Sequence, residues 1–376
     1  YEIRLSLVGS EMCIRDRVML SELGEPGQLL LKQSSVLVVG AGGLGCPVLL
    51  YLAAAGIGRI GIVDGDTIDI SNLHRQVLYT EEDIGKVKAE IAAQKLRIIN
   101  PHIKIENFNE NLSVLNANSL ISRFDLVIDC SDNYETRYLV NDSSVINDKP
   151  FVFGAIYKFE GQVSVFNYTN INGIKGPTYR CLFPQPPPKD FIPSCSEIGV
   201  IGILPAVVGS LMATEAVKIL SKIGELLSGE LLTFNLLRSE FSKVKFVRNN
   251  EDAIIKEIKV NPNKCNMNNI RNKSITVQEL KNLLNDGEDI QIVDVRETEE
   301  YLICNIGGDL IPLSSLPENC SKISKTKRVV VHCHHGMRSQ NAIQWLSQNM
   351  GLTNLENLTG GIEAWSVEID PKISRY

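Results

Sequence analysis

The sequence Gly40-Ala41-Gly42-Gly43-Leu44-Gly45 follows directly after the apolar run 36–39 (VLVV), and this junction decides the fold. Glycines at this spacing let the backbone approach a phosphate closely, and a helix that begins behind them points free N–H groups at it. Asp64 ends the next apolar run, nineteen residues after Gly45, where an acid is placed to bind a ribose hydroxyl. The sequence therefore predicts a strand, a nucleotide-binding turn and a helix. The glycines that would face the nucleotide are Gly40, Gly42, Gly43 and Gly45.

Short apolar runs alternate with helical patterns over the first two thirds of the chain. We expect strands at 36–39, 59–64, 103–108, 126–130 and 151–153, and helices at 46–55, 85–99, 133–146 and 204–221. This alternation predicts a mainly parallel sheet that is covered on both faces. Residues 162–168 alternate at period two, and runs at 231–236 and 243–247 follow. The predicted fold class is α/β: a doubly wound, Rossmann-like sheet with an antiparallel extension, followed by a smaller α/β domain.

Cationic and acidic side chains gather after these predicted strands. Arg75 follows the ribose acid in the motif SNLHRQ, Lys86 and Lys88 open the next predicted helix, and Asp132 follows the fourth strand, with Arg137 one turn later. A nucleoside triphosphate needs such cations because its charge must be neutralised during attack at phosphorus. Asp132 could hold Mg²⁺ there. The glycine turn alone would equally suit an NAD- or FAD-dependent oxidoreductase, and the cations could be ordinary surface charges.

A second loop, Cys333-His334-His335-Gly336-Met337-Arg338, follows the apolar run 329–331. A turn between a strand and a helix points backbone N–H groups at the sulfur of Cys333, and Arg338 adds positive potential. Both favour the thiolate, which is the nucleophilic form, and the same cradle could hold an anionic persulfide. A metal site at 332–335 is disfavoured because consecutive residues of one tight turn rarely converge on one ion.

Length and composition describe a soluble protein of two or three domains, with 376 residues and a net charge of −6, which implies no basic face for nucleic acid. Nine cysteines without a Cys-x-x-Cys pair argue against a disulfide framework and for a reducing, cytoplasmic location. Cys46 and Cys130 are expected in the core. The apolar stretch 198–220 contains Glu215 and Lys218, which favours a buried helix over a membrane span.

We expect four segments along the chain. Residues 1–17 have no clear period and resemble a translated sequencing-adapter fragment, so we expect them to be non-native; their interrupted apolar core disfavours a secretory signal. A nucleotide-binding domain should span 18–250. An Asn-rich linker should span 251–273, and the domain that carries the cysteine loop should span 274–376.

The first domain resembles the MoeB/ThiF adenylyltransferases, relatives of ubiquitin-activating enzymes. The resemblance rests on GAGGLG, VDGD, SNLHRQ, GKVKA and DCSDNYETR in the family's order. It implies that ATP is attacked by the C-terminal carboxylate of a ubiquitin-like sulfur carrier that ends in Gly-Gly, which gives an acyl-adenylate. It also implies that Asp64 binds ribose, that Asp132 acts with Mg²⁺, and that the remaining nucleotide contacts come from Asn72, Arg75, Lys88 and Asn133.

Two departures from this family matter, and a third position, Cys195, agrees with some of its members. Its structural zinc is held by two Cys-x-x-Cys pairs, but here the first position reads Thr178-Tyr179-Arg180-Cys181 and the second pair is missing, so we predict no zinc. An arginine of the family's first helix, which reaches the partner's nucleotide in a homodimer, is replaced by Asp16. Cys195 stands where some members link covalently to the carrier, and it could equally be a structural thiol.

The second domain resembles the rhodanese sulfurtransferases, whose active loop is Cys-x-x-Gly-x-Arg. The motifs VDVRE at 293–297, IPL at 311–313 and GGIEAW at 360–365 support it. A six-residue loop fits sulfur, whereas related phosphatases have a longer one. The chain is therefore expected to adenylate the carrier and to deliver sulfur from Cys333, which is loaded by a persulfide donor such as a cysteine desulfurase. The product is a thiocarboxylate for molybdopterin or thiamine synthesis. A non-catalytic carrier-binding protein remains an alternative.

Overall fold

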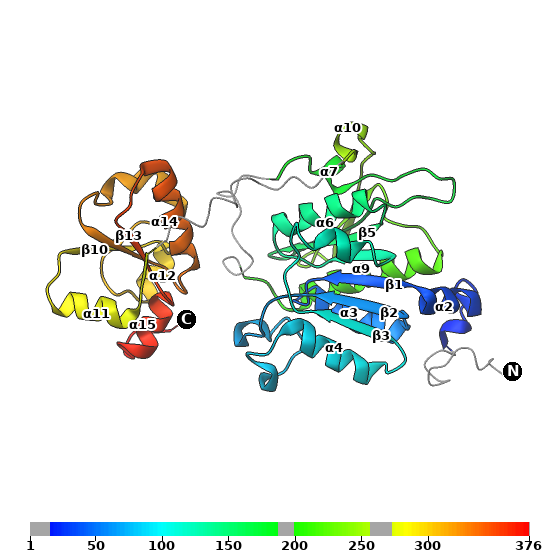
Figure 1. Cartoon of the computed structure of the whole chain (residues 1–376), viewed down its shortest axis with the longest axis horizontal. Helices are drawn as coiled ribbons and strands as arrows, with labels where there is room; N and C mark the ends of the chain where they lie inside the picture. Colours follow the sequence, from blue (N-terminus) through cyan, green and yellow to red (C-terminus); the bar gives the residue numbers. More distant parts are fainter. Residues whose placement is uncertain (1–15, 187–198, 256–272, 376) are drawn as a thin grey trace. The chain divides into compact units, whose positions relative to one another are not determined.

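The computed structural model describes residues 16–186, 199–255 and 273–375. Among these residues, an eight-stranded sheet forms the centre of the N-terminal unit, which extends to Val260 (Figure 1). The strand order is β3-β2-β1-β4-β5-β6-β7-β8, and the first five strands are parallel. Strands β6 to β8 add an antiparallel extension. The strands are β1 Ser35–Val39, β2 Arg59–Val63, β3 Lys104–Phe108, β4 Leu126–Asp129, β5 Phe151–Tyr157, β6 Glu160–Phe166, β7 Glu230–Asn235 and β8 Glu240–Lys245. The predicted doubly wound α/β fold with its antiparallel extension is confirmed.

Helices cover both faces of this sheet, because successive side chains of a strand point to opposite faces. Val36 and Val38 of β1 join one core with helices α3, α4 and α9, while Leu37 and Val39 join a second core with α5 and α6. The helices are α2 Gly24–Gln33, α3 Gly45–Ala55, α4 Lys88–Ile99, α5 Ala117–Ile121, α6 Tyr134–Ile146, α7 Tyr179–Leu182, α9 Ile203–Ser221 and α10 Asn250–Ala253.

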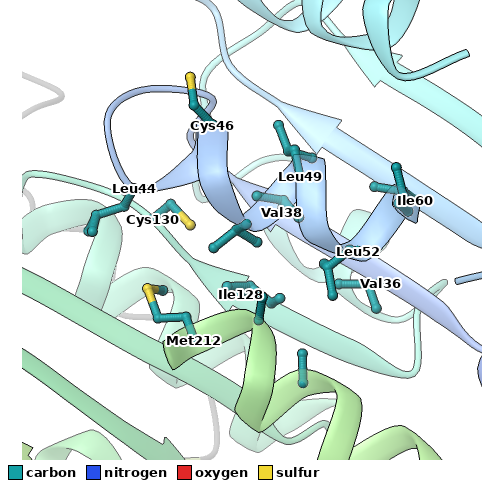
Figure 2. Close-up of a cluster of buried hydrophobic side chains, with 14 of the residues drawn as sticks. Val36, Val38, Leu44, Cys46, Leu49, Leu52, Ile60, Ile128, Cys130 and Met212 are labelled. Atoms are coloured by element: carbon teal, nitrogen blue, oxygen red, sulfur yellow. The ribbon is translucent and has the colours of Figure 1, made fainter. Parts of the chain in front are cut away.

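The hydrophobic core next to the loop 40–45 contains Cys46 and Cys130, as the sequence predicts. Figure 2 shows Cys46 and Cys130 among apolar side chains that include Leu49 and Met212. Burial raises the pKa of the Cys46 thiol to about 12, so this thiol stays protonated and unreactive at neutral pH. The packing role predicted for these two cysteines is confirmed.

Helix α9 is long and apolar enough to cross a membrane, and it is the one such helix among the described residues. It packs against α3, β5 and β6, and Leu204, Val208 and Met212 are fully buried there. Each such side chain contributes about 1.5–3 kcal/mol when it leaves water. The prediction of a buried helix is confirmed.

One predicted helix boundary is wrong. The helix expected at 85–99 begins at Lys88, because Gly85 adopts a left-handed turn with φ 82° and Val87 forms a β-bridge with Thr67. Lys86 therefore lies before the helix, and its carbonyl accepts a hydrogen bond from the Ile68 amide at 2.9 Å.

The C-terminal unit, which begins at Asn261, contains a five-stranded parallel sheet in the order β11-β10-β12-β13-β9. The predicted linker, 251–273, lies largely outside the described residues, and the predicted domain bounds stay predictions. The strands are β9 Lys273–Ile275, β10 Ile290–Asp294, β11 Asp309–Leu310, β12 Arg328–His332 and β13 Leu355–Leu358. The helices are α11 Val277–Asn285, α12 Thr298–Ile303, α13 Leu316–Asn319, α14 Met337–Met350 and α15 Gly361–Glu368.

Candidate functional site

The glycine loop, residues 40–45, lies at the carboxyl end of β1 and packs against the turn that follows β4. Gly40 has φ 93°, and a Cβ on it would lie 2.9 Å from the Cys130 carbonyl oxygen. A Cβ on Gly45 would lie only 2.1 Å from the Gly40 carbonyl oxygen. The loop can therefore adopt its tight turn only with glycine at these two positions.

Two side chains hold Ala41 of this loop, one through its backbone amide and the other through its carbonyl oxygen. The Asp64 carboxylate accepts hydrogen bonds from the Ala41 amide at 2.7 Å and from the Asp66 amide at 2.9 Å. The Tyr79 hydroxyl donates to the Ala41 carbonyl oxygen at 2.8 Å and lies 3.3 Å from the Lys88 carbonyl oxygen. Burial raises the pKa of Asp64. Sequence reasoning missed Tyr79, because no local pattern marks a tyrosine that folds back onto a loop 38 residues away.

Arg75 lies beside the glycine loop. A Cβ on Gly43 would lie 3.7 Å from Cδ of Arg75, and one on Gly42 would lie 3.6 Å from Nε2 of Gln76. The Arg75 guanidinium donates to the Ser71 carbonyl oxygen at 3.1 Å. The Asn72 side-chain oxygen accepts from Gln76 at 2.8 Å. The structure thus brings Asn72 and Arg75 next to the glycine loop, although they lie about thirty residues away from it in sequence.

The structure separates the two lysines of the GKVKA motif. Lys88 is 6% exposed and its Nζ lies 3.1 Å from the Asp66 carboxylate, two residues beyond Asp64. The Lys86 side chain is 54% exposed and lies 3.8 Å from Asp83. A buried ammonium group needs a nearby negative charge, and in this structure Asp66 supplies it for Lys88. The role of Lys88 at the phosphates stays a prediction.

The turn after β4 carries Asp132 on its exposed side. The Asn133 side chain caps α6 by accepting from the Thr136 amide at 2.9 Å, and its amide nitrogen lies 3.5 Å from the Asp132 carboxylate. Arg137, which was considered as a phosphate cation, is buried instead. It donates to the Ser131 carbonyl oxygen at 3.2 Å and lies 3.8 Å from buried Asp129. Arg137 therefore holds the turn that presents Asp132.

The position of the family's zinc has a different donor set in this chain. The Cys181 sulfur accepts from the Asn249 amide at 3.3 Å and from the Thr178 amide at 3.4 Å. The Thr178 hydroxyl lies 3.3 Å from the same sulfur. One thiol, one hydroxyl and backbone amides do not fit a tetrahedral zinc site, which needs four ligands such as thiolate or imidazole. These residues fit a hydrogen-bonded turn, and the absence of zinc stays a prediction.

The Cys333 loop follows β12 in the C-terminal unit. Cys333 is 1% exposed, and its sulfur accepts a hydrogen bond from the Gly336 amide at 3.1 Å. A Cβ on Gly361 would lie 2.4 Å from the Cys333 carbonyl oxygen, which also accepts from the Ile362 amide at 2.9 Å. The first turns of α14 and α15 therefore both hold this loop, so the GGIEAW motif has a direct structural role.

Charged side chains surround the base and the rim of this loop. Arg338 forms a two-pronged ion pair with Glu300 of α12, with both N···O distances at 2.6 Å. Arg296 and Asp294, which were predicted to be structural, form a fully buried pair at 2.6 Å. Burial lowers the pKa of His332 and of His334, so both rings are neutral at neutral pH. No group of three or more metal-binding side chains was found among the described residues.

The predicted site residues thus fall into two groups, of which Cys333 and Arg338 form the one in the C-terminal unit. In the N-terminal unit, contacts join the glycine loop to Asp64 and Arg75, and Lys88 lies close to Asp66. Asp132 and Asn133 lie on the neighbouring turn, which meets Gly40 at Cys130. Cys195 lies outside the described residues.

Comparison with known proteins identifies both units. Residues 14–255 match the ThiF family, and residues 276–368 match the rhodanese-like domain. The chain belongs to the ThiF family. The predicted combination of a MoeB/ThiF-type domain with a C-terminal rhodanese domain is confirmed.

Curated relatives with the same two-part architecture cover almost the whole chain. A probable adenylyltransferase/sulfurtransferase MoeZ of Mycobacterium tuberculosis is 40% identical over 96% of this chain and 93% of its own length. The adenylyltransferase and sulfurtransferase MOCS3 of Xenopus laevis is 38% identical over 96% of this chain and 87% of its own. A further relative matches a smaller part of the chain: a sulfur carrier protein adenylyltransferase of Thermus thermophilus is 54% identical over 62% of this chain and 86% of its own length. The predicted enzyme class, an adenylyltransferase and sulfurtransferase, is confirmed.

Solved structures support the fold of the N-terminal unit. Escherichia coli MccB with AMPCPP and MccA superposes with a TM-score of 0.52 at 22% identity, over 60% of this chain and 67% of that one. PaaA superposes with a TM-score of 0.51 at 21% identity, over the same shares of the two chains.

Proposed function

We propose that this chain uses ATP to adenylylate the C-terminal glycine of a ubiquitin-like sulfur carrier of the MoaD/ThiS type, and then converts that glycine to a thiocarboxylate. The observation that carries the proposal is the 40% identity to an adenylyltransferase/sulfurtransferase over 96% of the chain, because it includes both units. The hydrogen-bonded glycine loop supports a site for the first half of the reaction, and the buried Cys333 supports one for the second.

In the first half of the reaction, the carrier carboxylate attacks the α-phosphorus of ATP, and pyrophosphate leaves. We assign ribose binding to Asp64, and phosphate binding to the glycine loop with Asn72, Arg75 and Lys88. Their positive charge would offset the charge that develops on the phosphoryl oxygens. Asp132, with Asn133 beside it, is the residue we assign to Mg²⁺, which would neutralise the triphosphate.

In the second half, Cys333 acts as the sulfur donor. Its thiolate first takes the terminal sulfur of a protein persulfide, from a donor such as a cysteine desulfurase, and the donor thiol leaves. The resulting Cys333 persulfide attacks the carbonyl carbon of the acyl-adenylate and displaces AMP, which forms an acyl disulfide. A second thiol, for which Cys195 is our candidate, then attacks the Cys333 sulfur, cleaves the S–S bond and releases the thiocarboxylate. This leaves a disulfide between the two cysteines, which a cellular dithiol reductant must reduce before the next turnover.

The proposal also covers the location of the protein, its oligomeric state and the pathway that it supplies. We infer a cytoplasmic homodimer that binds neither nucleic acid nor membrane and supplies sulfur to molybdopterin or thiamine synthesis. The odd number and irregular spacing of the cysteines support a reducing compartment, and the net charge of −6 gives no basic face for nucleic acid.

Two variants of the full chain test the two halves separately. Asp132→Ala should abolish carrier-dependent exchange of labelled pyrophosphate into ATP but leave sulfur loading of Cys333 intact. Cys333→Ala should do the reverse, with exchange retained and carrier thiocarboxylate lost. Wild-type chain that binds the carrier without pyrophosphate exchange would instead support a non-catalytic carrier-binding protein and overturn the proposal.

A further inference from the structure

Arg338 is the permanently charged cation of the loop 333–338, and its charge is matched by one carboxylate. Both terminal nitrogens of Arg338 donate to Glu300, one to each oxygen, at 2.6 Å. A two-pronged pair of this kind fixes the guanidinium plane as well as its position. The side chains of Arg338 and Glu300 are 16% and 22% exposed, so the pair is shielded from most of the solvent.

Glu300 is held in place from its other side. It is the third residue of α12, and its carboxylate also accepts from the Glu297 amide at 3.0 Å, which closes the capping box of this helix. A carboxylate held by a helix N-terminus and by a guanidinium cannot leave easily. The positive charge of Arg338 is therefore neutralised before any sulfur donor arrives.

Two neighbouring ionisable groups, His334 and Glu363, do not replace that charge. Burial lowers the pKa of His334, whose Nε2 lies 4.0 Å from the Glu363 carboxylate. Glu363 is itself paired with Arg375. The Cys333 sulfur itself is contacted by the Gly336 amide at 3.1 Å and by the Ser339 hydroxyl at 3.5 Å, and neither group carries a charge.

Sulfur donors differ in the charge that they bring to such a loop. Thiosulfate is a small dianion without further surface to bind, so it depends on a cation at the loop. A persulfide on a protein thiol carries at most one negative charge, and its carrier protein can bind through a wide interface. A neutralised Arg338 therefore disfavours the first class far more than the second.

We propose that Glu300 is a specificity-determining residue, which neutralises Arg338 and thereby reserves Cys333 for persulfides over small dianionic sulfur donors. The inference rests on the proposed sulfur-transfer function. With a persulfide, the Cys333 thiolate forms an S–S bond to the terminal sulfur while the donor's own S–S bond breaks and its thiolate leaves. With thiosulfate, the same bond forms and sulfite leaves with two negative charges. Neither step needs an oxidant or a reductant.

The test compares the two donors on the full chain. The loading of Cys333 is followed by mass spectrometry, with thiosulfate and with a persulfide-loaded cysteine desulfurase as probes, in wild type and in Glu300→Gln. The amide retains an oxygen for the Glu297 amide but no longer supplies the negative charge that Glu300 places against Arg338. We expect the ratio of kcat/KM for thiosulfate to that for the persulfide to rise roughly tenfold, since a charge-assisted hydrogen bond to the dianion becomes available. The gain should shrink at high salt.

Two further variants keep the result interpretable. Glu299→Gln removes the same charge from an exposed position of the same helix and should leave the donor ratio unchanged. Adding Arg338→Gln to Glu300→Gln should cancel the gain. An unchanged ratio in a folded Glu300→Gln protein, or an equal gain in Glu299→Gln, overturns this inference alone. Failure of both donors to load wild-type Cys333 overturns the proposed sulfur step as well.

Discussion

Asp64 and Ala41 are joined by a hydrogen bond of 2.7 Å, in which the carboxylate at the end of β2 accepts the amide proton of the glycine loop. A buried carboxylate is costly unless it is hydrogen-bonded, and here its other oxygen accepts the Asp66 amide. The acid predicted to bind ribose therefore has a second task, which is to fix the loop before the nucleotide arrives.

Asp64→Asn should separate these two tasks. The new amide NH₂ group must face either the Ala41 or the Asp66 amide, so one hydrogen bond is lost and two donors oppose each other. We expect the free energy of unfolding without nucleotide to fall by about 1–3 kcal/mol, measured by urea denaturation, and KM for ATP to rise. If Asp64 only bound ribose, KM would rise and the stability of the nucleotide-free protein would not change.

Tyr79→Phe should weaken ATP binding more than it slows turnover. The variant removes the hydroxyl that contacts Ala41 and leaves the ring in its buried place. Loss of one such bond corresponds to about 1 kcal/mol, or roughly a fivefold rise in KM for ATP in pyrophosphate exchange. Tyr51→Phe, on the exposed face of α3, is the matched control and should behave as wild type. Equal KM values for the two variants would contradict a bracing role of Tyr79.

Alanine at Gly45 and at Gly42 of the glycine loop should affect the stability of the protein differently. Gly45→Ala places a Cβ 2.1 Å from the Gly40 carbonyl oxygen, so the turn cannot close and the protein should lose several kcal/mol of stability. A Cβ on Gly42 has ordinary contact distances, so Gly42→Ala should unfold at the wild-type temperature. If the backbone there approaches phosphate, as the sequence predicts, KM for ATP should still rise. A wild-type KM in Gly42→Ala would remove Gly42 from the nucleotide site.

Glu106 should make the stability of the N-terminal unit depend on pH. Its hydrogen bond with Arg59 and the ammonium group of Lys104 lower its pKa to about 2, against burial that raises it. A carboxyl with a lowered folded-state pKa contributes stability above its ordinary pKa near 4.5 and loses it as the pH falls towards 2. Glu106→Gln should thus cost about 1–2 kcal/mol at pH 7 and almost nothing at pH 2, measured by urea denaturation. A gap that does not change with pH would contradict this ion pair.

The sequence was sufficient for the features that depend on local pattern. Apolar runs such as 36–39 and 126–130 are buried strands because both faces of a parallel sheet are covered. The glycines at 40 and 45 mark a turn that no other residue can form, and Cys333 lies at the end of a strand because the run before it is apolar. Periodicity, turn chemistry and family motifs are all properties of neighbouring residues.

The features that the sequence did not predict depend on residues that meet across the fold. Tyr79 contacts Ala41 and Glu300 contacts Arg338, each across 38 residues of sequence. Arg137 looked like a phosphate cation because its motif lies beside Asp132, but tertiary packing buried it against Asp129. The helix start at Lys88 was misplaced because a β-bridge between Thr67 and Val87 outweighs the local helical pattern.

The turn at Cys181 should be stable without metal. Its sulfur is satisfied by the Thr178 and Asn249 amides, so α7 and the segment after β8 are joined by hydrogen bonds where the family has a zinc site. Purified protein should contain no stoichiometric zinc, and incubation with 1,10-phenanthroline should leave Tm unchanged. Cys181→Ser keeps an acceptor at this position and should cost only about 1 kcal/mol, whereas loss of a ligand from a structural zinc site removes most of the folding energy that the metal supplies. One zinc ion per chain, together with a large fall in Tm on chelation, would show that other residues complete a metal site around Cys181.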